Sequence, residues 1–199
     1  MTREPRRHGR PPFLSTHAEP PGFPSWLSRD VVLLDGRRVF VRPVLPDDLA
    51  ELHRAVAEAD LETLRSRFLG ARPPRSDQEF DRLVHLDYDR RLAVLALSPD
   101  GRGVGIARYD ASTGTDLAEV AVAVGPTWRR VGLATALIRL LAAGAVRNGI
   151  HRFTAELFEA NQDVRELFAE TGLPYQTTAA VAGVVTIEVA LPADAADLL

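Results

Sequence analysis

The sequence has 199 residues, 46% of them hydrophobic, and this length suits one globular domain. Its net charge of −3 at pH 7 gives no general electrostatic reason to bind nucleic acid. Cysteine is absent, which excludes disulfides, thiolate nucleophiles and cysteine-based zinc sites and favours a reducing cytoplasm. No apolar run approaches the roughly 20 residues that a membrane span requires.

The chain begins with a segment, residues 1–24, that is rich in proline and arginine. Such a segment buries too little apolar surface to offset the entropy of ordering its backbone. We therefore predict a disordered tail over residues 1–24 and a single folded domain over residues 25–199.

The first half of the domain carries clear turn and cap signals. Asp35-Gly36 lies between two short apolar runs, which indicates a β-hairpin. Ser76 followed by Glu79 is the pattern of a helix capping box. The elements expected here are strands at 31–34 and 38–44 and helices starting at 46, at 62–68 and from 77 to about 86.

Strand and helix patterns alternate in the second half. The segment 117–157 is typical of a βαβ unit, with Gly149 and Gly172 where helices are expected to end. We predict an α/β (α+β) fold in which helices flank a central mixed, mostly antiparallel sheet. The expected strands are 92–97, 104–109, 117–124, 152–157, 175–180 and 183–191, and the expected helices are 131–149 and 164–171.

The segment Arg129–Ala134 has the features of a phosphate-binding loop. It follows a strand that stops at Gly125-Pro126, and it starts a long helix, whose N-terminus offers free N–H groups and partial positive charge. Gly132 and Ala134 leave room for a diphosphate, while the two arginines add donors. A Walker A loop is excluded because the chain has no lysine. The alternative is that Gly132 only permits close helix–sheet packing.

The same loop resembles the Arg/Gln-x-x-Gly-x-Gly/Ala signature of the GNAT superfamily of N-acetyltransferases. Two later features agree with that family. Asn161 follows the strand expected at 152–157, and Leu167–Leu173 is similar to the family's Leu-Tyr-x-x-x-Gly-Phe ending. The resemblance covers roughly residues 38–190. It implies the GNAT fold, with acetyl-CoA as acyl donor and its pyrophosphate on the loop.

A narrower similarity is to bacterial protein lysine acetyltransferases, which modify acyl-CoA synthetases and similar enzymes. It is carried by short segments at 67–68, 86–89, 105–109 and 118–122. This resemblance implies a protein lysine as acceptor and Glu119 as general base. A carboxylate in the mostly apolar run 117–124 is unusual in itself, since an unpaired charge is costly to bury. The alternative is a surface glutamate paired with Arg108 of the neighbouring strand.

The family resemblance also implies a set of cofactor-binding residues. Many members have a tyrosine where this chain has Phe168, so water protonates the leaving thiolate here or the thiolate leaves unprotonated. Asn161 is expected to contact the cofactor, to cap the following helix, or both. The complete set is Ala121, Val122, Ala123 and Val124 for the pantetheine arm, Arg129, Arg130, Val131, Gly132, Leu133, Ala134 and Thr135 in the loop, and Asn161 and Phe168 downstream.

Two other functions stay open from the sequence: acetylation of a small-molecule amine, and non-catalytic binding of acyl-CoA. Tyr88, Tyr109 and Tyr175 are spare phenols that we expect to serve in packing. His53 and His85 have no metal-ligand spacing, so no metal is expected. The oligomeric state, monomer or homodimer, is not indicated.

Overall fold

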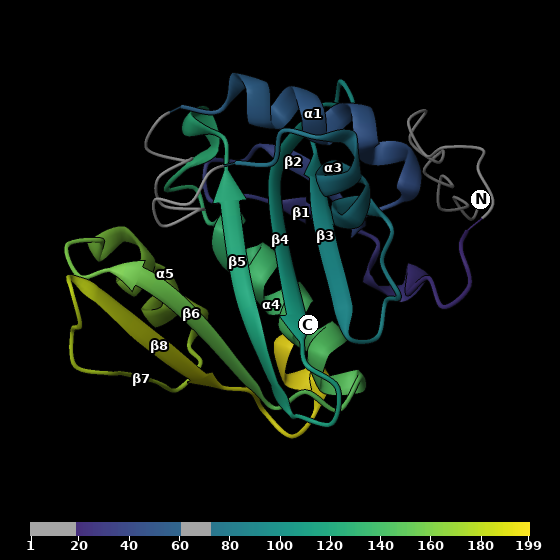
Figure 1. The fold of residues 1–199 in the computed structure, drawn as a ribbon. Coiled ribbons are helices and arrows are strands. Elements are labelled where there is room, and N and C mark those ends of the chain that lie inside the picture. Colours follow the sequence, from purple (N-terminus) through teal and green to yellow (C-terminus); the bar gives the residue numbers. More distant parts are fainter. Residues whose placement is uncertain (1–18, 61–72) are drawn as a thin grey trace, which may run out of the picture.

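The computed structural model of the chain describes residues 19–60 and 73–199. Its strands form one mixed sheet in the order β1-β2-β3-β4-β5-β6-β8-β7 (Figure 1). Neighbouring strands are antiparallel except for β5 and β6, which are parallel. The strands are β1 Arg29–Val32, β2 Arg38–Pro43, β3 Arg91–Leu97, β4 Gly103–Ala111, β5 Leu117–Val124, β6 Arg152–Phe158, β7 Tyr175–Thr177 and β8 Val184–Ala190.

The α-helices in the described parts of the chain are α1 Leu49–Glu58, α3 Asp77–Val84, α4 Leu133–Arg147 and α5 Gln162–Thr171. The predicted mixed, mostly antiparallel sheet with a βαβ unit is therefore confirmed, the unit being β5–α4–β6. The helix expected at 62–68, the segment 67–68 and most of the predicted tail lie outside the described residues. Within the described residues, no helix is both long and apolar enough to cross a membrane.

Strand β3 divides the core into two layers. Leu92, Val94 and Ala96 belong to a large apolar cluster with α4, whereas Ala93, Leu95 and Leu97 belong to a smaller one with α1 and α3. Successive side chains of a strand point to opposite faces of the sheet. Helix α4 therefore covers one face, and α1 and α3 cover part of the other, as Figure 1 shows.

The local signals of the sequence account for the element boundaries. The capping box forms as predicted, because the Ser76 hydroxyl accepts from the Glu79 N–H and the Glu79 carboxylate accepts from the Ser76 N–H. Gly172 ends α5 with a φ of 73°. The long helix begins two residues later than predicted, at Leu133, because Gly132 has a φ of 81° and acts as its N-cap.

Strands β5 and β6 pair over only a short stretch. Leu117 to Glu119 lie opposite Arg152 to Thr154, and beyond Glu119 strand β5 pairs with β4 alone. Figure 1 shows the two strands diverging from that point toward the start of α4. The β5 edge that faces β6 is thus left without strand partners between Val120 and Val124.

A buried ion pair joins β2 to the start of α1. The Arg42 guanidinium donates to both carboxylate oxygens of Asp48, at 2.7 and 2.6 Å, and the side chains are only 5% and 8% exposed. Asp48 also accepts from the Leu45 N–H at 2.7 Å. Removing one partner would leave the other charge buried and unpaired, so the pair is costly to break. It therefore holds the start of α1 next to β2.

We expect Asp48→Ala to lower the free energy of unfolding by about 3–5 kcal/mol, the usual penalty for breaking a buried pair. Replacing both partners, as in Arg42→Met with Asp48→Leu, removes both buried charges and is expected to cost much less. Urea denaturation of the three proteins measures the difference. A single variant that loses less than the double variant would contradict this role for the pair.

Candidate active site

The predicted phosphate loop has an unusual backbone conformation. Arg130 and Gly132 have positive φ angles of 57° and 81°, and the Val131 carbonyl between them accepts from the Leu34 N–H at 3.1 Å. The helix that follows has no side-chain cap at its N-terminus. The first N–H groups of α4, from Leu133 to Thr135, have no carbonyl one turn earlier to donate to, so they remain available to an anion.

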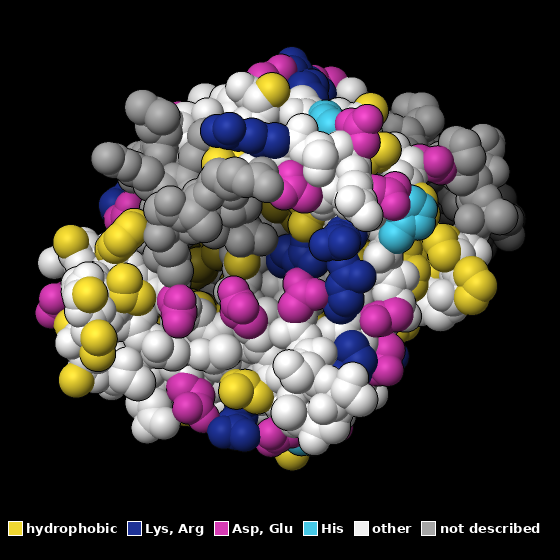
Figure 2. Space-filling model, in the orientation of Figure 1, with side chains coloured by type: hydrophobic (Ala, Val, Ile, Leu, Met, Phe, Trp, Pro, Cys, Tyr) yellow, Lys and Arg dark blue, Asp and Glu magenta, His cyan; other side chains and the backbone are white. Residues whose placement is uncertain are grey.

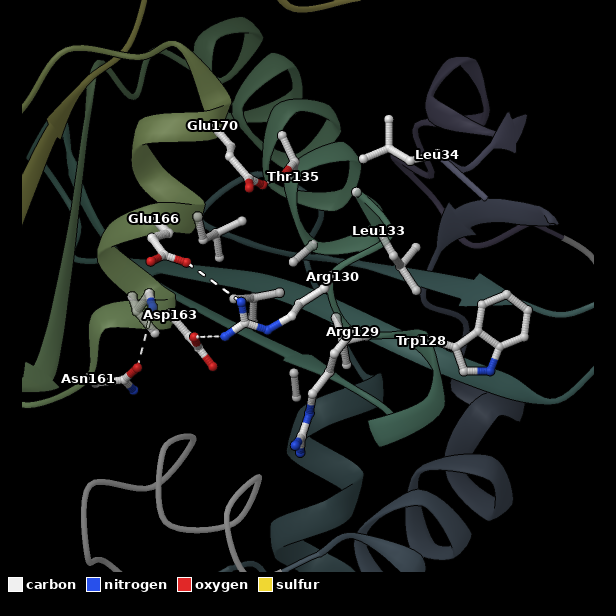
Figure 3. Close-up of a pocket in the computed structure, with 17 residues that line it drawn as sticks. Leu34, Trp128, Arg129, Arg130, Leu133, Thr135, Asn161, Asp163, Glu166 and Glu170 are labelled. Carbon is white, nitrogen blue, oxygen red and sulfur yellow. Dashed lines mark hydrogen bonds and ion pairs between the residues drawn. The ribbon is translucent and has the colours of Figure 1, made fainter. Parts of the chain in front are cut away.

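This loop opens into a cavity of about 270 Å³ between the end of β5, the start of α4 and α5 (Figure 3). Three of the predicted cofactor-binding residues, Ala121, Val131 and Phe168, do not line it. The predicted residues that do line it are Val122, Ala123, Val124, Arg129, Arg130, Gly132, Leu133, Ala134, Thr135 and Asn161.

The two arginines of the loop lie differently. Arg130 extends across the cavity toward α5, where it pairs with Asp163 at 2.5 Å and approaches Glu166 at 3.9 Å (Figure 3). Arg129 instead points toward the end of α1 and donates to both carboxylate oxygens of Asp60 at 2.9 Å. Both arginines line the cavity, and Arg130 is the one whose side chain crosses it.

Asn161 combines the two roles that the sequence left open. Its side-chain oxygen accepts from the Val164 N–H at 3.3 Å and so caps α5. The same residue lines the cavity. Capping fixes the side chain at the mouth of the gap between β5 and β6, so the two roles support each other.

Glu119 lies outside the cavity, on the face of the sheet away from α4. Its neighbours in the strand, Ala118 and Val120, are buried against α4, whereas Glu119 is exposed. The expectation of a costly buried carboxylate is therefore wrong, because strand alternation turns this residue outward. Val122, where the cavity begins, is three positions further along β5, or roughly 10 Å at the usual rise per residue.

The alternative pairing of Glu119 with Arg108 does not form. Arg108 lies opposite Ala121 and pairs with Asp110 at 2.7 Å, while Asp110 lies opposite Glu119. Within the described part of the chain, Glu119 has no ion pair. Its carboxylate is thus free to accept a proton from a group that approaches the open face.

Phe168 and the three tyrosines do not line the cavity. Phe168 is 2% exposed and belongs to the core. Burial, with a contribution from Asp48, raises the pKa of Tyr88 to about 12, and its hydroxyl donates to the Val44 carbonyl. Burial also raises the pKa of Tyr109, whose hydroxyl donates to the Asp89 carbonyl. Tyr175 is exposed on β7, at the sheet edge.

Part of the cavity wall was not predicted from the sequence. Leu34, from the tip of the β1–β2 hairpin, lines it across a long sequence separation that no local pattern reveals. The acidic side of the wall was accessible to prediction, since Asp163, Glu166 and Glu170 recur at spacings of three and four residues and so share one face of a helix. Thr135 donates to Glu170 across the cavity at 3.1 Å.

Comparison with known proteins gives one consistent result. The sequence profile of the acetyltransferase (GNAT) family matches residues 58–173. Acetyltransferase PA5475 of Pseudomonas aeruginosa is 33% identical over 141 residues, which cover 69% of this chain and 76% of that protein. Acetyltransferase Pat of Mycolicibacterium smegmatis is 30% identical over 160 residues, or 79% of this chain, but the match spans only 47% of Pat.

Solved structures agree with the sequence comparison. The GNAT domain of S. lividans PAT superimposes with a TM-score of 0.78 at 32% identity, covering 85% of this chain and 99% of that domain.

A charge reversal inside the cavity tests whether an anion binds at the loop. Ala134 lies in the first turn of α4 and lines the cavity, so Ala134→Glu keeps the helix N-terminus favourable for folding but repels a diphosphate. We expect the affinity for coenzyme A, measured by calorimetry, to fall at least about tenfold. Ala136→Glu, two positions along the same helix and off the cavity wall, is the matched control, and equal affinities for the two variants would exclude this anion site.

Proposed function

This chain is a member of the acetyltransferase (GNAT) family, and we propose that residues 25–199 act as one catalytic domain that transfers an acetyl group from acetyl-CoA to a lysine ε-amine of a protein. The observation that carries the proposal is the placement of two groups on either side of β5. The loop cavity lies at one end of the strand, and the free Glu119 carboxylate lies on the open face, just before the unpaired edge begins.

The cavity has the features that an acyl-CoA requires. Free N–H groups at the start of α4 and the Arg130 guanidinium are donors for the diphosphate. The β5 edge between Val120 and Val124 has backbone groups that no β6 residue satisfies, and these are suited to the amides of the pantetheine arm. A backbone N–H on this edge would polarise the thioester carbonyl.

The chemistry then needs one base. A lysine ε-amine has a pKa of about 10.4 in water, so nearly all of it is protonated at neutral pH. In our proposal Glu119 accepts that proton, directly or through a water molecule, and the neutral amine attacks the thioester carbon. A C–N bond forms, the C–S bond breaks, the attacking nitrogen releases its second proton to solvent, and the coenzyme A thiolate leaves. Solvent supplies its proton, since Phe168 has none to donate and is buried.

The open sheet face favours a protein acceptor over a small amine. Glu119 of β5 and Glu156 of β6 are exposed on this face, and Glu188 of β8 follows in the same row as Glu119 and Thr154. Figure 2 shows acidic side chains on the exposed surface of the sheet, with arginine side chains beside some of them. Glu188 is paired with Arg152, whereas the Glu119 carboxylate remains available to attract a cationic lysine. The open face also leaves room for the polypeptide that carries the lysine, whereas a small amine is usually held in an enclosed pocket.

We further propose that the acceptor is an acyl-CoA synthetase or a similar metabolic enzyme and that the reaction takes place in the cytoplasm. The support is the similarity of residues 86–89, 105–109 and 118–122 to bacterial protein lysine acetyltransferases, together with the absence of cysteine.

Incubation with acetyl-CoA and an acyl-CoA synthetase, followed by mass spectrometry of acetyl-lysine, tests this function. We expect Glu119→Gln to lower the transfer rate by about 10²–10⁴-fold, the usual contribution of a general base, with the affinity for acetyl-CoA unchanged. Glu156→Gln removes a carboxylate from the same face and is the control, with a much smaller effect. Undiminished transfer by Glu119→Gln would exclude Glu119 as the base.

A further inference from the structure

A second cavity, which has no role in the proposed acetyl transfer, lies on the opposite side of β5 from the loop cavity. It has a volume of about 180 Å³ and lies between α1 and strands β4 and β5. Ala123 and Val124 line both cavities. Because β5 has no β6 partner at this level, nothing in the sheet separates the two cavities along that edge.

The lining of this second cavity is apolar and built from small residues. Leu52, Leu95, Ile106 and Ala123 provide carbon surface, and Ala55, Ala59 and Gly103 add little side-chain bulk on the same side. On β5, Ala123 lies two residues beyond Ala121, so the two side chains point to the same face of the sheet. A chain that starts beside Ala121 and extends along this face enters the cavity.

A network of charges holds the cavity open. Glu51 accepts from the Gly103 N–H, and Arg54 donates to the Gly103 carbonyl at 3.3 Å. Arg102 also pairs with Glu58 at 3.2 Å. These contacts fix α1 to the start of β4 at its polar edge, so the helix does not move in to fill the space with its own side chains.

The charged groups at this cavity are already paired, which disfavours a cationic occupant. Burial alone would raise the pKa of Glu51, but hydrogen bonds from Arg54 and Gly103 hold that pKa below its ordinary value. The Arg54 pKa is raised by the hydrogen bond to Glu51 despite partial burial. With each carboxylate committed to an arginine, the remaining surface suits an uncharged hydrocarbon chain.

We propose that this second cavity binds the acyl chain of the donor and that the protein accepts acyl-CoA thioesters with chains longer than acetyl. The inference rests on the proposed function, since it needs the thioester at the β5 edge. An acetyl methyl fills little of a 180 Å³ space, in which one water molecule takes about 30 Å³. Each further methylene gains apolar burial there.

Calorimetric titration of the full chain with coenzyme A and with acetyl-, propionyl- and butyryl-CoA tests the proposal without an acceptor protein. The dissociation constant is expected to fall about fourfold for each methylene from acetyl to butyryl. Ala55→Leu fills the cavity from an exposed helix position. It should raise the butyryl-CoA dissociation constant about tenfold and leave the acetyl-CoA value within about twofold. Ala57→Leu, also exposed on α1 but away from the cavity, should keep the wild-type series.

Two results would overturn the inference while the proposed function stands. One is a wild-type series in which coenzyme A binds but affinity stays level or falls as the chain lengthens, which would leave the cavity to the acceptor or to solvent. The other is an Ala55→Leu variant that weakens all four ligands equally. If coenzyme A itself does not bind, the proposed function fails first, and the inference fails with it.

Discussion

The parallel pairing between β5 and β6 ends at Glu119, and the candidate site depends on that termination. Had the ladder continued, the backbone groups from Val120 to Val124 would be satisfied within the sheet and no chain could enter between the strands. The divergence leaves a free strand edge that leads from the loop before α4 to the open face that carries Glu119. Donor binding and the proposed chemistry are thereby arranged along β5. The anion-binding loop follows the end of this strand, and Glu119 lies just before its free edge.

The surrounding structure holds this gap open. The core against α4 fixes the position of β5, and Asn161 caps α5 at the far side of the cavity. Arg130 lies between them, paired with Asp163 and near Glu166. An incoming diphosphate would therefore compete with two carboxylates for this arginine. This competition makes the backbone N–H groups of α4, which have no such competitor, the more important donors.

Much of this organisation was predictable from the sequence because local rules govern it. The hairpin at Asp35-Gly36, the capping box at Ser76 and the βαβ unit all follow from short patterns, and the loop before α4 was identified from Gly132 and its flanking residues. The environment of Glu119 was not predictable, since its exposure depends on which face of β5 meets α4. Leu34 was missed because it reaches the cavity only through the pairing of the hairpin with Val131, far away in the sequence.

Hydrogen–deuterium exchange of the full chain, with and without acetyl-CoA, tests whether the donor binds at the loop and along the free edge of β5. We expect added acetyl-CoA to slow exchange at two places: the amides of Leu133 to Thr135 at the start of α4, and the amides of the β5 edge between Val120 and Val124. Amides of β1 and β8, away from the gap, should be unchanged. Slowed exchange elsewhere, with none at the loop and the β5 edge, would contradict the site described.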